Sequence, residues 1–314
     1  MEKEKLKIAF YWAASCGGCE VAVLDVNEKI LDVVAAADIV FWPVAIDIKY
    51  KDVEAMPDKS IDACFFNGAI RTEENEKMAN LLRQKSKILV AFGSCACDGC
   101  VKGLANLWDK ETIFERAYSE TPSTQNPEYV TPKTRLKVKE GELELPEFYD
   151  TVKTLPQTVD VDYTISGCPP PIPEILNMFM AIISGNLPPK GSSFLPNKSV
   201  CDECPREKKD KQLSEIKRIY ELEDDLESCF LDQCVICMGP ATRAGCDAQC
   251  PKVNVPCTGC GGPGPRVIDQ GAAAIGALAS IATNPDVVKE IVDPVGTFYK
   301  YSLAHSILRR KVKK

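Results

Sequence analysis

The residues best suited to do chemistry in this chain are its cysteines. The 314-residue sequence contains 16 cysteines but a single histidine, His305. C-x-x-C pairs begin at Cys16, Cys201, Cys234 and Cys257, among others, and several isolated cysteines stand beside glycine or proline. Thiolates are soft ligands that hold iron–sulfur clusters or zinc. The pattern therefore predicts metal binding by cysteine, and the scarcity of histidine argues against catalysis by a histidine base.

Composition and charge argue against several classes of protein. Hydrophobic residues make up 45% of the chain, the net charge is −7 and the pI is near 5.1. An acidic chain lacks the basic face of a nucleic-acid binder, and its apolar runs are too short to cross a bilayer. The N-terminus has no signal peptide or twin-arginine pair. We expect a cytoplasmic globular protein with no membrane span and no nucleic-acid partner, in which disulfides are rare.

The first half of the chain alternates strand and helix patterns. Strands are predicted at residues 6–12, 38–44, 61–66, 87–92 and 161–165. Helices are predicted at residues 21–37 and 173–184, and another is predicted to begin after an N-cap at Thr72. This alternation predicts a parallel α/β sheet. Residues 118–160 are rich in proline, threonine and charge, and we expect a long surface excursion there.

Four cysteines follow the ends of predicted strands. Cys16 and Cys19 follow the first strand, Cys95 the fourth, and Cys168 the fifth. The carboxyl ends of parallel strands meet at one edge of a sheet, where ligands bind in open α/β folds. The sequence therefore predicts that four distant thiols converge, which is the number that a [4Fe–4S] cluster needs.

The second half holds the densest group of cysteines. A Pro-, Gly- and Ser-rich segment at residues 185–198 predicts a boundary between a domain of residues 1–190 and a domain of residues 191–314. Helices are predicted in the second domain at residues 206–227, 271–283 and 295–311. The nine cysteines after the boundary can supply two further sets of four, with one left over.

Several motifs carry a family resemblance. LKIAFYWAASCGGCE, GSCACDGC and SGCPPP resemble the proximal-cluster motifs of the [NiFe] hydrogenase small subunit. CMGPATRAGC and PCTGCGGPGPR resemble that family's C-terminal cluster domain. With RTEENE and GLANLW, the chain is most similar to the cytoplasmic methyl-viologen-reducing, deazaflavin-nonreducing group associated with heterodisulfide reductase. The resemblance implies a flavodoxin-like parallel-sheet domain, then a small iron–sulfur domain rich in loops and helices.

The resemblance also implies three [4Fe–4S] clusters and their ligands. The proximal ligands would be Cys16, Cys19, Cys95 and Cys168; the medial ligands Cys246, Cys250, Cys257 and Cys260; and the distal ligands Cys201, Cys204, Cys229 and Cys237. Cys250 stands where respiratory members have proline, which favours a four-iron medial cluster. Two questions stay open: whether Cys234 or Cys237 is the distal ligand, and whether Cys97 or Cys100 competes with Cys95.

Three other residues are interpreted individually. Cys64, inside a predicted strand, is most simply a small buried hydrophobe. Glu20 is either a proton relay toward a partner or a solvated carboxylate at a helix start. Arg71 is either an interface or cluster-tuning charge, or a solvated side chain at a helix start.

The resulting functional hypothesis is an electron-transfer subunit with no catalytic residue of its own. It would relay electrons from H2 oxidation in a [NiFe] large subunit to an iron–sulfur adaptor subunit and a heterodisulfide-reductase-type complex. One alternative is a relay of the same fold in a non-hydrogenase redox complex, because the N-terminal half also resembles the cluster-bearing subunit of respiratory complex I. That subunit lacks the Cys-rich C-terminal domain. A structural zinc protein is the third hypothesis.

Overall fold

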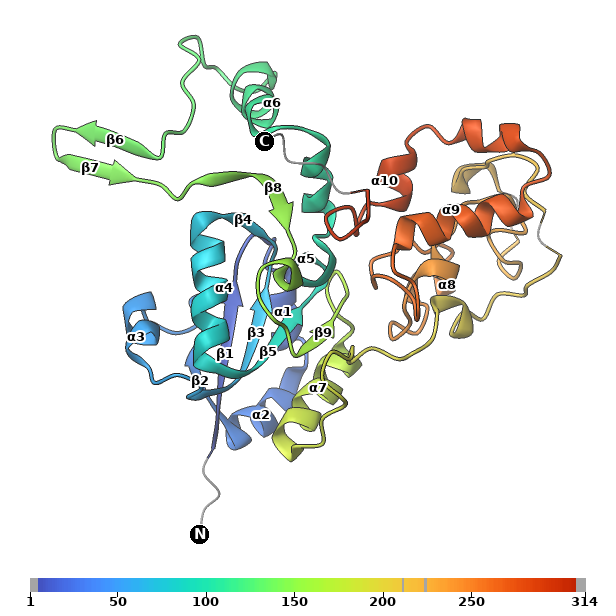
Figure 1. The fold of residues 1–314 in the computed structure, drawn as a ribbon. Helices are drawn as coiled ribbons and strands as arrows, with labels where there is room; N and C mark the ends of the chain where they lie inside the picture. Colours follow the sequence, from blue (N-terminus) through green and yellow to red (C-terminus); the bar gives the residue numbers. More distant parts are fainter. Residues whose placement is uncertain (1–4, 211, 223–224, 309–314) are drawn as a thin grey trace.

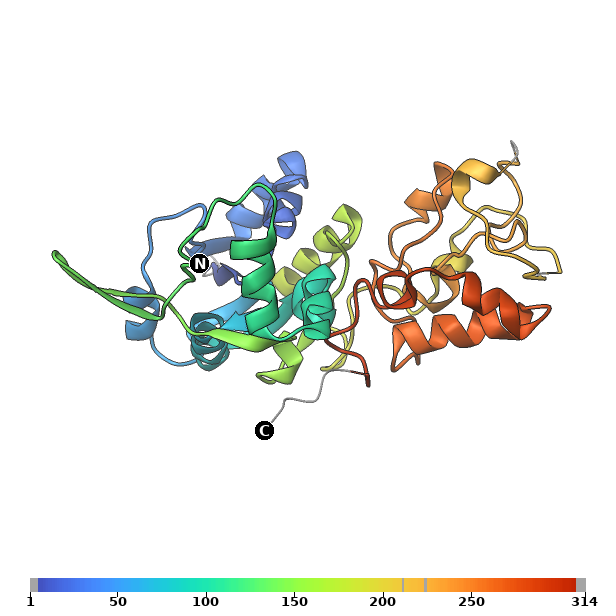
Figure 2. The ribbon, with the colours of Figure 1, turned by 90° about the horizontal axis from the view of Figure 1, so that it is seen from above.

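The computed structural model describes residues 5–210, 212–222 and 225–308. An α/β body formed by the first part of the chain is followed by a smaller body of loops and short helices, as Figure 1 shows. The two bodies lie side by side when the molecule is seen from above in Figure 2. Within the described residues, no helix is long and apolar enough to cross a membrane.

The α/β body is built on a five-stranded parallel sheet. Its strands are β1 (Leu6–Trp12), β2 (Ala37–Phe41), β3 (Ile61–Asn67), β5 (Ser86–Phe92) and β9 (Tyr163–Ile165), in the order β2-β1-β3-β5-β9. Taken in chain order, this is the 2-1-3-4-5 order of flavodoxin-like sheets. The strand sequences are almost continuously apolar because helices cover both faces. The predicted α/β class and all five predicted strands are confirmed, with bounds shifted by a few residues.

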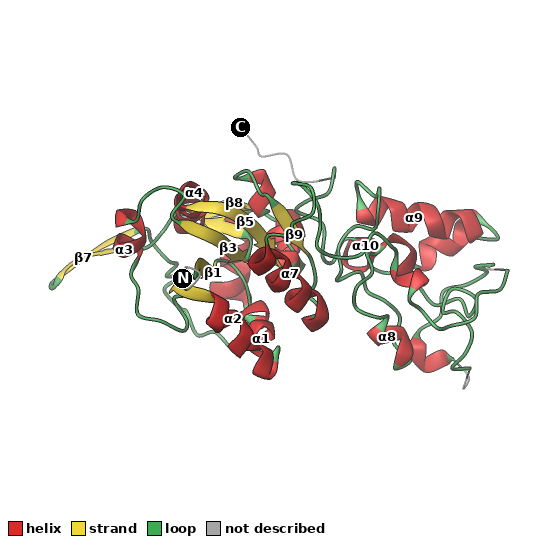
Figure 3. Ribbon diagram, turned by 90° about the horizontal axis from the view of Figure 1, so that it is seen from below, coloured by secondary structure: helices red, strands yellow, loops and turns green. Residues whose placement is uncertain are grey.

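Helices cover both faces of the sheet, as Figure 3 shows. On one face lie α1 (Gly18–Leu24), α2 (Ile30–Ala36) and α7 (Ile172–Ser184), and on the other lie α3 (Tyr50–Ala55) and α4 (Glu73–Lys85). The single helix predicted over residues 21–37 is wrong. A 3-10 turn at Asn27–Lys29, where Asn27 has a φ of 54°, separates α1 from α2, since asparagine tolerates the left-handed conformation that interrupts a helix.

The start of α4 follows the predicted capping pattern. Thr72 Oγ1 accepts a hydrogen bond from Asn75 N at 3.3 Å, and Asn75 Oδ1 accepts one from Thr72 N at 3.2 Å. This reciprocal pair satisfies two donors at the helix start. The N-cap prediction for Thr72 is therefore confirmed.

The segment after β5 has more structure than an irregular excursion. It contains α5 (Ser94–Asp98), a 3-10 stretch (Val101–Leu107), α6 (Lys110–Glu115) and a π-helical turn (Arg116–Glu120). β6 (Arg135–Val138) and β7 (Gly141–Glu144) form a hairpin that projects from the body in Figures 1 and 2. β8 (Phe148–Lys153) pairs antiparallel with β4 (Ile70–Thr72). The predicted surface excursion over residues 118–160 therefore carries regular structure of its own.

The smaller body has little regular structure. Its elements are α8 (Gln249–Lys252), α9 (Gln270–Ile281), α10 (Pro294–Phe298) and 3-10 turns at Val200–Asp202, Ile219–Glu221, Gly239–Ala241 and Pro285–Glu290. The predicted helix at residues 271–283 is confirmed as α9.

Two predicted helices of this body are wrong. The described part of residues 206–227 forms loops that make isolated bridges to residues 228, 282 and 235. Leu213 packs against α9. It is the only fully buried apolar residue in the described part of this stretch, so the stretch has no buried helix face. The predicted final helix ends early: α10 stops at Phe298, and the chain turns back so that Ala304 packs against Gly99. Residues 309–311 of that prediction lie outside the described residues.

The segment that connects the two bodies packs in part against the α/β body. Ser193 bridges to Thr164 of β9, and Phe194 N donates to Thr164 O at 2.9 Å. Leu195 is buried in the hydrophobic core beneath the sheet. The chain therefore reaches residue 195 before it leaves the sheet, and the division at residue 190 stays a proposal.

Candidate functional site

The first set of thiols lies at the carboxyl edge of the sheet. Cys16 and Cys19 follow β1, Cys95 begins the turn after β5, and Cys168 follows β9. Cys19 and Cys95 are 6% and 4% exposed, whereas Cys16 and Cys168 are exposed. The structure thus brings together the four strand-end cysteines, two on the inner side and two facing outward.

A glycine makes room for the inner sulfur of this set. Gly93 has a φ of +85°, and a Cβ at this position would lie 2.3 Å from Cys19 Sγ. Burial, together with the negative charges of Cys95, Cys168 and Cys16, raises the pKa of Cys19. Charges influence a pKa in this way only when they are close in space, so the three other sulfurs of the set lie near Cys19.

The second set lines one cavity between the two bodies. This cavity is lined by Cys246, Cys250, Cys257 and Cys260, together with Ser166, Gly167, Thr242 and Arg243 among others. Gly167 belongs to the loop after β9 that also carries Cys168 of the first set, so this loop reaches the same cavity. All four cysteines assigned to the medial set thus share one enclosure.

The third set lines a separate cavity in the smaller body. Its wall contains Cys201, Cys204, Cys229 and Cys237, with Arg206, Lys208 and Phe230. Arg206 lies over the Phe230 ring at 4.0 Å and donates to Ser228 O at 2.8 Å. A Cβ on Gly239 would lie 3.1 Å from Cys201 Sγ and 3.5 Å from Cys237 Sγ, so a glycine again leaves room beside the sulfurs.

Cys234 points away from that cavity. It does not line the cavity; its Sγ lies 3.8 Å from both Ser214 Oγ and Gln212 O. The sequence could not separate Cys234 from Cys237, because both stand in one C-x-x-C pair. The backbone places the two residues differently, since Cys234 has a φ of 62° that turns the chain between them.

The three sets adjoin in series. Ser94 Oγ, next to Cys95, donates a hydrogen bond of 2.6 Å to Cys260 O, and Met238 N, next to Cys237, donates one of 2.8 Å to Cys257 O. Burial and then the charges of Cys246, Cys250 and Cys168 raise the pKa of Cys260 to about 11. The pKa of Cys257 is raised in the same way by burial and by Cys237. The second set therefore lies between the other two.

The donor sets suit clusters better than single ions. A tetrahedral zinc site holds its sulfurs about 3.8 Å apart, given Zn–S bonds of about 2.3 Å. Over residues 5–210, 212–222 and 225–308, no group of three or more His, Cys, Asp or Glu is tight enough for one ion. A cubane spreads four thiolates around its corners. The lining residues of the second and third cavities include no carboxylate, and three sets of four thiols fit such clusters chemically.

The cysteines outside the three sets differ in their surroundings. Cys64 in β3 is fully buried among apolar side chains, which confirms its reading as a small hydrophobe. Cys97 also points into the core, where its Sγ donates to Ala91 O at 3.2 Å. Cys100 is different, because its Sγ lies 3.7 Å from Cys168 Sγ. The sequence raised Cys100 only as a candidate competitor of Cys95, and no pattern of residues placed it beside Cys168.

Glu20 and Arg71 are both buried, so the solvated reading of each is wrong. The Glu20 carboxylate accepts hydrogen bonds from Trp42 Nε1 and, at 3.5 Å, from Asn67 Nδ2. Burial raises the pKa of Glu20 despite these two donors. The Arg71 guanidinium lies 4.2 Å from the centre of the Phe148 ring, and burial lowers its pKa to about 10.

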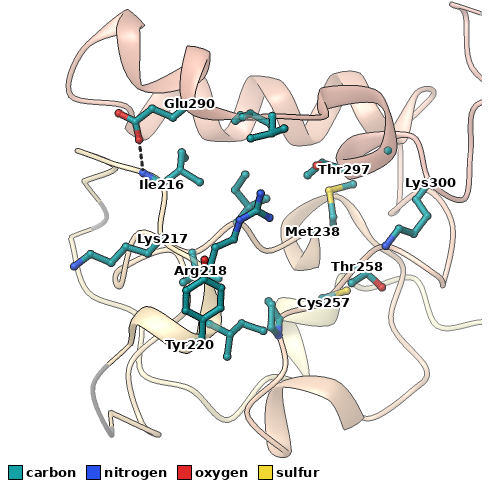
Figure 4. A pocket seen from close by; sticks show the side chains of 17 residues that line it. Ile216, Lys217, Arg218, Tyr220, Met238, Cys257, Thr258, Glu290, Thr297 and Lys300 are labelled. Carbon is teal, nitrogen blue, oxygen red and sulfur yellow. Dashed lines mark hydrogen bonds between the residues drawn. The ribbon is translucent and has the colours of Figure 1, made fainter.

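A further cavity, of about 370 Å³, opens in the smaller body. Figure 4 shows Lys217, Arg218 and Lys300 around it, with Glu290 bonded to the backbone of Ile216. Of the described cysteines only Cys257 lines it. The cavity therefore reaches the back of the second set, and its basic lining contrasts with the acidic charge of the whole chain.

Comparisons with known proteins extend over the whole chain. The family described as NADH ubiquinone oxidoreductase, 20 Kd subunit, matches residues 16–182. An F420-non-reducing hydrogenase iron-sulfur subunit of Archaeoglobus profundus is 45% identical, over 98% of this chain and 99% of its own length. An F420-non-reducing hydrogenase subunit of Methanothermobacter marburgensis is 38% identical, over 99% of this chain and 98% of its own length.

Solved structures share the fold. A chain of the [NiFeSe]-hydrogenase of Dm. baculatum superposes with a TM-score of 0.52 at 16% identity, over 83% of this chain and 95% of that chain. This likeness includes the cysteine-rich second body, because it extends beyond the sheet domain. The sequence relatives and the fold agree with the motifs described above. The chain therefore belongs to the [NiFe] hydrogenase small-subunit family, among the small subunits of the F420-non-reducing hydrogenases.

Proposed function

We propose that this chain is the electron-transfer subunit of its hydrogenase and relays electrons through three [4Fe–4S] clusters. The observation that carries the proposal is the serial arrangement of three sets of four thiols. Hydrogen bonds join the first set's loop to the second set's, and the second's to the third's. Electron tunnelling falls off steeply with distance, so a relay needs its centres in such a series.

The residues of this chain hold, orient and shield the clusters. The clusters, when bound, supply one-electron redox chemistry. Cys19 and Cys95 would hold the proximal cluster from the buried side, and Cys16 and Cys168 from the exposed side. Arg206, buried against Phe230, would exclude water from the distal site. Hydrogen bonds and solvent exclusion of this kind set cluster potentials.

The proposed partners follow from the relatives and from the exposed edge. The exposed cysteines after β1 and β9, with Trp12 40% exposed beside them, suit contact with a large subunit in which H2 is oxidised. Electrons would leave through the distal end to an iron–sulfur adaptor subunit and a heterodisulfide-reductase-type complex. This assignment rests on the family resemblance. The cytoplasmic location stays a prediction from the sequence.

The test uses the complex purified without air. We expect about twelve irons per chain with matching sulfide, and hydrogen-dependent dye reduction. Cys168→Ala should remove about four irons and abolish dye reduction, whereas Cys64→Ala, a buried thiol outside the three sets, should retain both. Zinc without iron, or full dye reduction by Cys168→Ala, contradicts the proposal.

A non-hydrogenase relay of the complex I type is the second candidate. The family description matched by residues 16–182 favours it. The match to the hydrogenase iron-sulfur subunit over 98% of the chain weighs against it, because it includes the cysteines of the smaller body. Copurification with a large subunit that contains nickel would separate the two candidates.

A further inference from the structure

A fifth sulfur lies beside the proximal set. Cys100 is 2% exposed, and its thiol donates to Cys168 Sγ at 3.7 Å. Cys168 is one of the four proposed proximal ligands, so Cys100 lies directly beside this set without being a member of it.

The backbone at this position is unfavourable for a residue with a side chain. Cys100 has a φ of 52° and a ψ of −157°, a region that is essentially restricted to glycine. Holding a non-glycine residue there costs free energy. Glycine would avoid this cost, so the strained cysteine is explained by what its thiol contacts.

A cation approaches the same side of the site. Lys102 Nζ lies 3.6 Å from Cys95 Sγ. Together, the Cys100 thiol and the Lys102 ammonium direct two hydrogen-bond donors at Cys95 and Cys168. In contrast, Cys97 donates to a backbone carbonyl in the core and does not contact these sulfurs.

We propose that Cys100 is a positioning residue of the proximal site, which donates an S–H hydrogen bond to the Cys168 thiolate and, with Lys102 at Cys95, raises the reduction potential of the cluster that Cys95 and Cys168 hold. The inference rests on the proposed function, because it needs a cluster at this set. Donors to a thiolate stabilise its negative charge, and the reduced cluster carries one more negative charge than the oxidised one. Reduction is therefore favoured when the donors are present.

The experiment compares variants of the purified complex by iron content and by a redox titration followed by paramagnetic resonance. Cys100→Gly suits the backbone and removes the donor. Cys100→Ser keeps a donor, and Lys102→Met removes the cation. We expect all three to keep about twelve irons per chain. Cys100→Gly and Lys102→Met should shift the proximal midpoint potential to more negative values, and Cys100→Ser should shift it less.

The melting temperature separates this role from a structural one. Cys100→Gly should melt at or above the wild-type temperature, because it relieves backbone strain. An unchanged midpoint potential in Cys100→Gly overturns the proposal. Loss of about four irons from a well-folded Cys100→Gly also overturns it, since Cys100 would then be a ligand. Wild-type protein without iron would instead defeat the proposed function itself.

Discussion

Ser94 Oγ donates a hydrogen bond of 2.6 Å to the carbonyl oxygen of Cys260, 166 residues further along the chain. The same hydroxyl accepts a hydrogen bond of 2.9 Å from Gly167 N. One buried side chain therefore ties the loops after β5 and β9 to the cysteine-rich body. This contact sets the position of the proposed medial site relative to the proximal one.

Ser94→Ala should weaken the junction between the two bodies. The change leaves the Gly167 N–H and the Cys260 carbonyl without this partner, which costs about 1–3 kcal/mol and lowers the melting temperature by roughly 2–8 °C. Ser184→Ala is the control, because its hydroxyl bonds to Met180 O on an exposed helix end. Equal melting temperatures for the two variants would contradict this role of Ser94.

Gly93→Ala should empty the proximal site without changing a ligand. The added Cβ would lie 2.3 Å from Cys19 Sγ, so the sulfur must move and about four irons per chain should be lost. Gly185→Ala is a matched control. Gly185 also has a positive φ, +76°, but with open space around it, so this variant should keep its iron. Retention of all iron in Gly93→Ala would argue against a cluster on Cys19.

Replacing Cys234 and replacing Cys237, the two members of one C-x-x-C pair, should affect the iron content of the protein differently. Cys237 lines the distal cavity and Cys234 does not. Cys237→Ser should therefore lose about four irons per chain, and Cys234→Ser should keep the full number. The reverse result, measured by iron analysis on protein purified without air, would move the distal ligand to Cys234.

Asp162 should stabilise the fold in a pH-dependent way. Burial by itself would raise the pKa of Asp162, but hydrogen bonds from Lys190 and Arg83 outweigh it and hold the pKa below its usual value. Its contribution is therefore complete above about pH 4, the usual aspartate pKa, and is lost as the pH falls through the lowered folded-state value. Asp162→Asn should cost about 2 kcal/mol at pH 7.

Thermal unfolding measured across the acid range tests the direction of this pH dependence. The difference between wild type and Asp162→Asn should shrink below about pH 4. Asp38→Asn provides the control, because the Asp38 side chain is 61% exposed and faces Lys5 at 3.4 Å. An exposed pair of this kind contributes about 0–1 kcal/mol. A difference that grows toward low pH would contradict the assignment.

Replacement by methionine should have different effects on the stability of the fold at two arginines of the sheet body. Among the described residues, the Arg71 Nη1 and Nη2 atoms have no hydrogen-bond partner, so Arg71→Met should be neutral or stabilising. Arg83 donates to Asp162 at 2.6 Å, and its loss leaves a buried carboxylate short of a donor, at a cost of about 3 kcal/mol. Strong destabilisation by Arg71→Met, measured by thermal unfolding, would reveal a partner that this chain does not supply.

The sequence by itself was sufficient for the α/β class, the five parallel strands and the convergence of Cys16, Cys19, Cys95 and Cys168. These features depend on local periodicity and on the rule that parallel strands end at one edge. The Thr72 N-cap could also be predicted from the sequence, because its hydrogen-bond partner Asn75 lies only three residues away.

Only the tertiary structure decided features that depend on contacts between distant segments. Leu213 packs against α9, so the segment around it is a loop despite its helical spacing. Cys234 and Cys237 are equivalent as letters, and the backbone turn at Cys234 separates them. Cys100 reaches Cys168 across 68 residues. Such placements follow from packing between segments far apart in the chain, which no local pattern of residues encodes.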